Sequence, residues 1–229
     1  MFTRLFLPLA SIVALSGCIG TDIVDDAVDP ELRIRATLDT LGFGESLQLE
    51  AMYLNRVGRE EAVEFVWESS APEVIDVTTE GLATAVSGGR ATLTASYVAD
   101  GIDVSDAIDL VAAEETVVVQ EPRSRSGQIN TTSSYVLTGG MTLTEQEGGG
   151  LLVEIADDYR ASTALPGLYV YLTNNPRTTN GALEIGPVEV FSGAHSYAIP
   201  DVAIEDYSHL LYFCKPFNVK VGDGEFEAL

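Results

Sequence analysis

Short segments in which apolar and polar residues alternate, separated by turn-forming residues, dominate this sequence. A period of two indicates half-buried β-strands, because successive side chains of a strand point to opposite faces of its sheet. No segment requires more than a single turn of helix. The sequence therefore predicts an all-β protein built from antiparallel sheets. The clearest segments are residues 47–53, 63–67, 91–97, 141–143, 151–155 and 168–172.

Turn and linker signals divide these segments into two units. Residues 31–114 have the spacing of an antiparallel sandwich of about 80–100 residues. Residues 115–126, with charge, Pro122 and small polar residues, are the predicted linker. Residues 127–229 return to strands, with turns at 148–150 and 174–176, and are predicted to form a second β-sandwich or β-barrel with its own core.

The N-terminus has the form of a bacterial export signal over residues 1–17. Arg4 supplies one positive charge, an apolar run extends from Leu5 to Leu15, and small residues precede Cys18. The apolar run is too short to span a bilayer as a stable helix. Residues 15–18 resemble the lipobox of bacterial lipoproteins, which implies cleavage before Cys18 and a lipid on that residue. An ordinary secretory signal that happens to end near a cysteine is the alternative.

A lipid on Cys18 would attach the protein to a membrane of the cell envelope, with residues 18–30 as an acidic tether. Ile19 follows the cysteine, where many Gram-negative lipoproteins kept at the inner membrane have aspartate. The resemblance therefore slightly favours the outer membrane. The net charge of −23 argues against binding nucleic acid through its phosphates.

The first unit carries three motifs in sequence: residues 65–77 with Trp67 and a Ser-Ser-Ala-Pro turn, residues 81–86, and residues 88–95. In order and spacing these motifs resemble the bacterial Ig-like domain of group 2, over residues 31–114. The resemblance implies a spacer or adhesive module on a cell surface. Trp67 lies on the apolar face of its predicted strand and is expected to add bulk to the core.

The second unit carries motifs at residues 135–140, 167–173, 192–200 and 210–219. They resemble the DM-thirteen electron-transfer domain over residues 127–229. Cys214 occupies the place of the cysteine near the end of that domain, which is thought to serve redox chemistry. The resemblance thus implies an electron-transfer module that acts with a redox protein partner.

The residues themselves leave the role of Cys214 open. With Cys18 lipidated, Cys214 has no intramolecular partner for a disulfide. A thiol is reactive only as an accessible thiolate, and Lys215 would help little because adjacent strand residues point to opposite faces. The alternative is a small buried hydrophobe that shares a face with Leu210 and Tyr212.

A metal site is not predicted, and no cofactor is identified. His195, His209 and Met141 could in principle join Cys214 around copper. However, His209 and Cys214 are five residues apart on one predicted strand, so their side chains leave opposite faces unless a bulge intervenes. Covalent c-type haem is excluded because no Cys-x-x-Cys-His sequence exists.

Two functions follow from these patterns, neither of them a classical enzyme activity, since no hydrolase, metalloprotease or nucleotide-binding motif is present. The first is a surface-anchored lipoprotein with a redox accessory domain on an Ig-like stalk, in which Cys214 reacts. The second is a non-catalytic surface binding or adhesion protein, in which loops such as residues 174–181 contact the ligand and Cys214 is packed.

Overall fold

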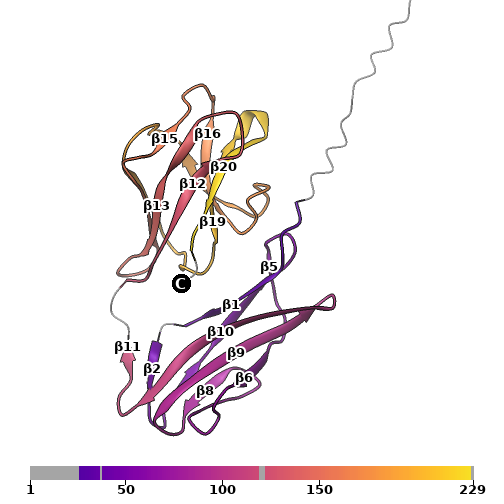
Figure 1. Cartoon of the computed structure of the whole chain (residues 1–229), viewed down its shortest axis with the longest axis vertical. Coiled ribbons are helices and arrows are strands. Elements are labelled where there is room, and N and C mark those ends of the chain that lie inside the picture. The colour runs from indigo at the N-terminus through magenta and orange to yellow at the C-terminus, as the bar shows by residue number, and fades with distance from the viewer. Residues whose placement is uncertain (1–25, 37, 119–121, 228–229) are drawn as a thin grey trace, which may run out of the picture.

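Two β domains make up the protein (Figure 1). The computed structural model describes residues 26–36, 38–118 and 122–227. Within that part of the chain the only helix is a single 3-10 turn, η1 (Lys215–Phe217), so the predicted all-β fold class is confirmed. No helix in the described ranges is long and apolar enough to cross a membrane.

The first domain packs three small sheets around two core clusters, which Trp67 and Ile108 both contact. β1 pairs with β4, whereas β2 joins β10 in the neighbouring sheet, so the start of the domain contributes to two sheets. The β2–β10 pair is parallel, which differs from the expected antiparallel arrangement. The strands are β1 (Glu31–Arg35), β2 (Leu38–Gly42), β3 (Ser46–Gln48), β4 (Glu50–Leu54), β5 (Glu60–Glu61), β6 (Val66–Ser69), β7 (Ile75–Val77), β8 (Leu82–Ala85), β9 (Gly89–Ala99), β10 (Ile102–Ala113) and β11 (Val117–Val118).

Two details of the first domain differ from or extend the sequence pattern. The predicted strand at 47–53 is split at Leu49, whose backbone N–H donates to the carbonyl of Gly81, and its halves β3 and β4 lie in different sheets. Within the predicted strand at 63–67, only Val66 and Trp67 belong to a strand. Trp67 packs against both core clusters of the domain, which confirms its predicted structural role.

The second domain is one nine-stranded sheet around a large apolar core. Its order is β17-β16-β19-β20-β12-β13-β14-β18, with β15 beside β13, so β17 and β18 are the two edges. The core contains Leu143, Val153 and Leu172 from the predicted strands. The strands are β12 (Ser124–Thr131), β13 (Leu137–Glu145), β14 (Leu151–Ile155), β15 (Arg160–Ala161), β16 (Leu168–Thr173), β17 (Leu183–Pro187), β18 (His195–Ile199), β19 (His209–Cys214) and β20 (Val219–Glu225).

Candidate functional site at the domain junction

Arginines of this acidic chain gather where the two domains meet. The chain has 12 lysines and arginines against 35 acidic residues, yet four arginines make hydrogen bonds across the junction. Arg33 and Arg35 lie on β1, Arg59 precedes β5, and Arg123 precedes β12. Cationic groups are therefore concentrated at one place in the fold, where they can be paired with carboxylates and carbonyls of both domains.

Because side chains alternate along β1, Arg33 points away from the first domain's core and toward the second domain. Leu32 and Ile34 on either side of it point into the first domain's core. Arg33 is only 8% exposed. Its Nε and Nη2 atoms donate to both oxygens of Glu31 at 2.6 and 2.7 Å, and its Nη1 atom donates to the backbone carbonyl of Glu205 at 2.6 Å. The guanidinium thus joins a carboxylate of one domain to the backbone of the other.

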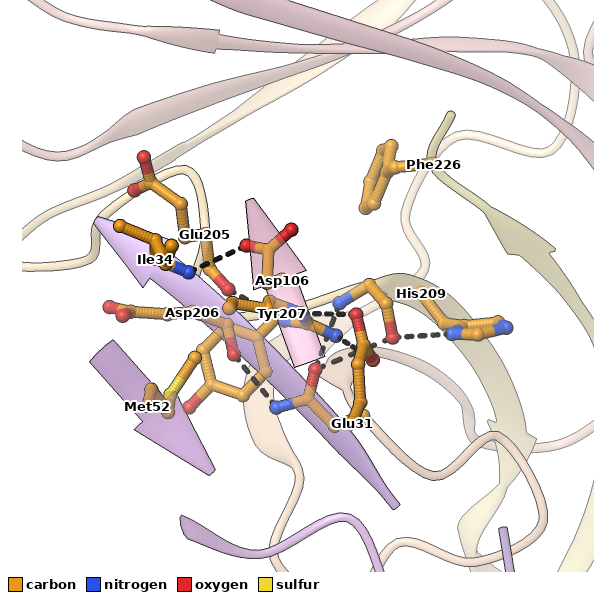
Figure 2. Close-up of polar contacts among 12 residues, drawn as sticks. Glu31, Ile34, Met52, Asp106, Glu205, Asp206, Tyr207, His209 and Phe226 are labelled. Carbon is orange, nitrogen blue, oxygen red and sulfur yellow. Dashed lines mark hydrogen bonds and ion pairs between the residues drawn. The ribbon is translucent and has the colours of Figure 1, made fainter. Parts of the chain in front are cut away.

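Further polar contacts surround the contact of Arg33 with Glu205. The backbone N–H of Ile34 donates to Asp106 at 2.7 Å. Arg35 forms an ion pair with Asp206 of the second domain. Figure 2 shows residues of the first domain (Glu31, Ile34, Met52 and Asp106) interspersed with residues of the second (Glu205, Asp206 and Tyr207).

Arg123 lies immediately before β12 and contacts residues of both domains. It donates to the carbonyl of Ala36 at 3.2 Å and forms ion pairs with Glu145 and Glu205. Its hydrogen bonds lower the pKa of Glu145 below the ordinary value. Glu205 is only 6% exposed, so this pair is largely shielded from solvent.

The loop after β16 forms another part of the junction. Asn175 is buried, and its Nδ2 atom donates to the carbonyls of Asp26 at 2.6 Å and Val57 at 3.3 Å. Asn174 donates through Nδ2 to the carbonyl of Asp206 at 2.7 Å and so fixes the loop to its own domain. Residues 174–181, which the sequence suggested as a ligand-contacting loop, therefore begin inside the junction.

An open cleft of about 740 Å³ lies beside these contacts. That volume falls within the range of pockets that bind small molecules. Both domains line it, including the edge strands β17 and β18 of the second domain. Its lining consists of Arg35, Met52, Leu54, Gly58, Arg59 and Glu60 from the first domain, and Asn174, Gly181, Leu183, Glu184, Ile185, Ala198, Ile199, Pro200, Asp201, Val202, Asp206 and Tyr207 from the second.

Cys214 lies elsewhere, inside the core of the second domain. It is 1% exposed, shares its face of β19 with Leu210 and Tyr212, and its Sγ atom lies 3.5 Å from the carbonyl of Pro166. Lys215 follows it as the first residue of η1 and is exposed. The thiol is thus shielded from solvent. Cys18, the predicted lipidation site, lies outside the described residues.

The candidate metal ligands are not brought together. His209 and Cys214 keep to opposite faces of β19, and Met141 is buried in the core. The Nδ1 atom of His195 lies 3.0 Å from the carbonyl of Gly193, and its ring packs edge-on against Tyr159 with centroids 4.9 Å apart. Among the residues described, no group of three or more histidine, cysteine, aspartate or glutamate side chains is placed to hold a metal ion.

Sequence reasoning missed a cluster of buried aromatic residues with polar groups. The hydroxyl of Tyr197 and the Nε2 atom of His195 are buried and form no hydrogen bond within the described part of the chain, and the buried hydroxyls of Tyr159 and Tyr212 interact with each other. Burial raises the pKa of Tyr212 well above its ordinary value. Sequence reasoning also missed Arg33, Arg35 and Arg123. For Arg33 the available signal was its position between the apolar residues Leu32 and Ile34 of a strand, which indicates a side chain directed away from the core.

Comparison with known proteins identifies no family. No protein-family description matches the chain, and no curated protein matches it. Two solved structures of surface layer protein SbsC, one titled for domains 1–6, share 15% identity with this chain at a TM-score of 0.29. Each match covers 86% of this chain and 27% of that protein, so the chain spans about a quarter of its length. At that TM-score the likeness supports no conclusion about function.

Proposed function

We propose that this protein is a lipid-anchored, non-catalytic binding module of the bacterial cell envelope. One observation carries the proposal: two of the arginines that join the β domains, Arg35 and Arg59, also border an open cleft that both domains line. The lipobox at residues 15–18 supports the anchor on Cys18. The proposal includes an Ig-like group 2 domain at residues 31–114 and a DM-thirteen-like domain at residues 127–229.

The junction is suited to holding the cleft in one shape. Arg33 and Glu205 are both more than nine-tenths buried, and Arg33 donates to the Glu205 carbonyl while Arg123 pairs with its carboxylate. A hydrogen bond to a charged group typically contributes about 1.5–3 kcal/mol. A loss of that size is a large fraction of the stability of a domain. The two domains are therefore expected to present the cleft as one unit.

The burial of Cys214 favours binding over electron transfer. A reactive cysteine needs an accessible thiolate, whereas this thiol is 1% exposed and surrounded by apolar side chains. The redox role that the resemblance implies would require the thiol to become exposed. Cys214 is accordingly treated as a packing residue in this proposal.

Two experiments test the proposal. Radiolabelled palmitate should enter the wild-type protein in a bacterial host, and Cys18→Ser should abolish the label and release the protein from the membrane fraction. An unlabelled wild-type protein would contradict the anchor.

The second experiment measures the rate at which a thiol reagent labels Cys214 in the purified protein across a urea series. We expect labelling to follow the unfolding transition, in a protein without visible absorbance. Fast labelling in the absence of urea would contradict the non-catalytic role and favour electron transfer.

A further inference from the structure

The sheet of the second domain is open, and both of its edge strands line the junction cleft. β17 contributes Leu183, Glu184 and Ile185 to the lining, and β18 contributes Ala198 and Ile199. An edge strand presents a row of backbone N–H and C=O groups that can pair with another chain. The cleft therefore combines a pocket with two possible templates for an added strand.

β17 has features that protect an edge from pairing. It ends at Pro187, and its pairing with β16 shifts register between Val170 and Tyr171. Its Glu184 forms an ion pair with Lys215, with an Nζ to Oε2 distance of 2.8 Å. Proline, irregular pairing and charge are the devices by which natural edge strands avoid adding a further strand.

β18 has none of these features. It pairs with β14 in an unbroken register from Leu151↔Ile199 to Ile155↔His195. Residues 195–199 contain no proline and no aspartate, glutamate, lysine or arginine, and Ser196 and Ala198 are exposed. Among the described residues, β14 is the only strand that pairs with β18. An uncharged and regularly paired edge of this kind is a template for strand addition.

The charges of the cleft lining and of the whole chain indicate which kind of polypeptide can pair with β18. The cleft lining carries the carboxylates of Glu60, Glu184, Asp201 and Asp206 against the guanidinium groups of Arg35 and Arg59, so its acidic groups outnumber its basic ones. The whole chain carries a net charge of −23. A second copy of this protein would therefore be repelled, whereas a positively charged segment would be attracted.

On the basis of the proposed function, we propose that β18 takes up an extended, positively charged segment of a partner polypeptide as an additional strand. Five residues of strand extend roughly 17 Å, so a segment of about five to seven residues matches the edge. Its backbone pairs with β18, and its basic side chains face the carboxylates of the cleft.

Blocked seven-residue peptides serve as probes of the purified full-length protein. The first alternates lysine and valine, the second alternates glutamate and valine, and the third is the lysine peptide with N-methyl groups on alternate backbone nitrogens. Calorimetry gives the affinities, and amide NMR shifts locate the site. We expect only the first peptide to bind well, with shifts at residues 195–199. The other two should bind at least about tenfold more weakly, since one loses the charge attraction and the other loses backbone hydrogen bonds.

Two matched variants test the edge from the protein side. Ala198→Lys adds a positive charge at an exposed position of β18 and should weaken the lysine peptide at least about tenfold. Ser105→Lys adds the same charge at an exposed position of β10 and should leave the affinity unchanged. Equal binding of the N-methylated peptide, or an unaffected Ala198→Lys variant, would overturn strand addition at β18.

The outcomes separate this inference from the proposed function. If the peptides fail to bind while palmitate labelling and thiol protection are as expected, strand addition at β18 is wrong and the proposed function stands. If Cys214 labels fast in the folded protein, the proposed function fails whatever the peptides do.

Discussion

Replacing Gly58 with alanine tests whether the junction holds the two domains together. Gly58 has a φ of 74°, and a Cβ atom on it would lie 2.9 Å from the carbonyl carbon and oxygen of Asn174 in the second domain. Rotation of a side chain cannot relieve a contact with backbone atoms. The variant therefore has to move the domains apart locally in order to fold.

Gly44 provides a matched control within the first domain. Its φ is 77°, and a Cβ atom there would meet nothing within 4 Å. Alanine in this left-handed region costs about 1–2 kcal/mol at either position. Overpacking against Asn174 adds about 1–3 kcal/mol to Gly58→Ala alone. We therefore expect losses of about 2–5 kcal/mol for Gly58→Ala and about 1–2 kcal/mol for Gly44→Ala.

Differential scanning calorimetry measures the difference. For a cooperative unit of 150–250 residues, 1 kcal/mol shifts the melting temperature by about 2–4 °C, so Gly58→Ala should melt roughly 2–12 °C below Gly44→Ala. Small-angle X-ray scattering should also show a larger radius of gyration for Gly58→Ala. Equal melting temperatures and equal radii for the two variants would refute the contact between Gly58 and Asn174.

Three further predictions concern single groups. Arg33→Met leaves the carbonyl of Glu205 without its donor and should lower the free energy of unfolding, measured in urea, by about 1–3 kcal/mol. The control Arg90→Met removes an exposed ion pair and should change that free energy by less than about 1 kcal/mol. Equal losses in the two variants would count against a special role for Arg33. Tyr197→Phe removes a buried hydroxyl that has no hydrogen bond in the described structure, so the free energy of unfolding should rise by about 1 kcal/mol, and a fall would mean that the hydroxyl has a partner. Burial lowers the pKa of His209 below 6.5 in the folded state, so the unfolded state binds a proton more readily and the protein should lose stability as the pH falls below 6.5. In urea titrations at several pH values, His209→Asn should reduce that loss. An unchanged pH dependence would contradict this prediction.

The sequence by itself predicted the features that depend on neighbouring residues. Alternation identified strands such as β14 and β16, placed Trp67 against the core, and put Cys214 on the same strand face as Leu210 and Tyr212. These predictions succeeded because the period of two is a property of the strand backbone and survives in any sheet.

Only the tertiary structure decided which partner each strand and side chain meets. Alternation could not show that residues 47–53 divide between two sheets, because the period gives the face of a residue and not the identity of the neighbouring strand. The alternation indicates that Arg33 points away from the core. It does not show which group Arg33 binds, because the carbonyl belongs to Glu205, 172 residues further along the chain. The junction and its cleft form only when the two domains pack against each other, whereas the open edge at β18 is set by the pairing of strands within the second domain.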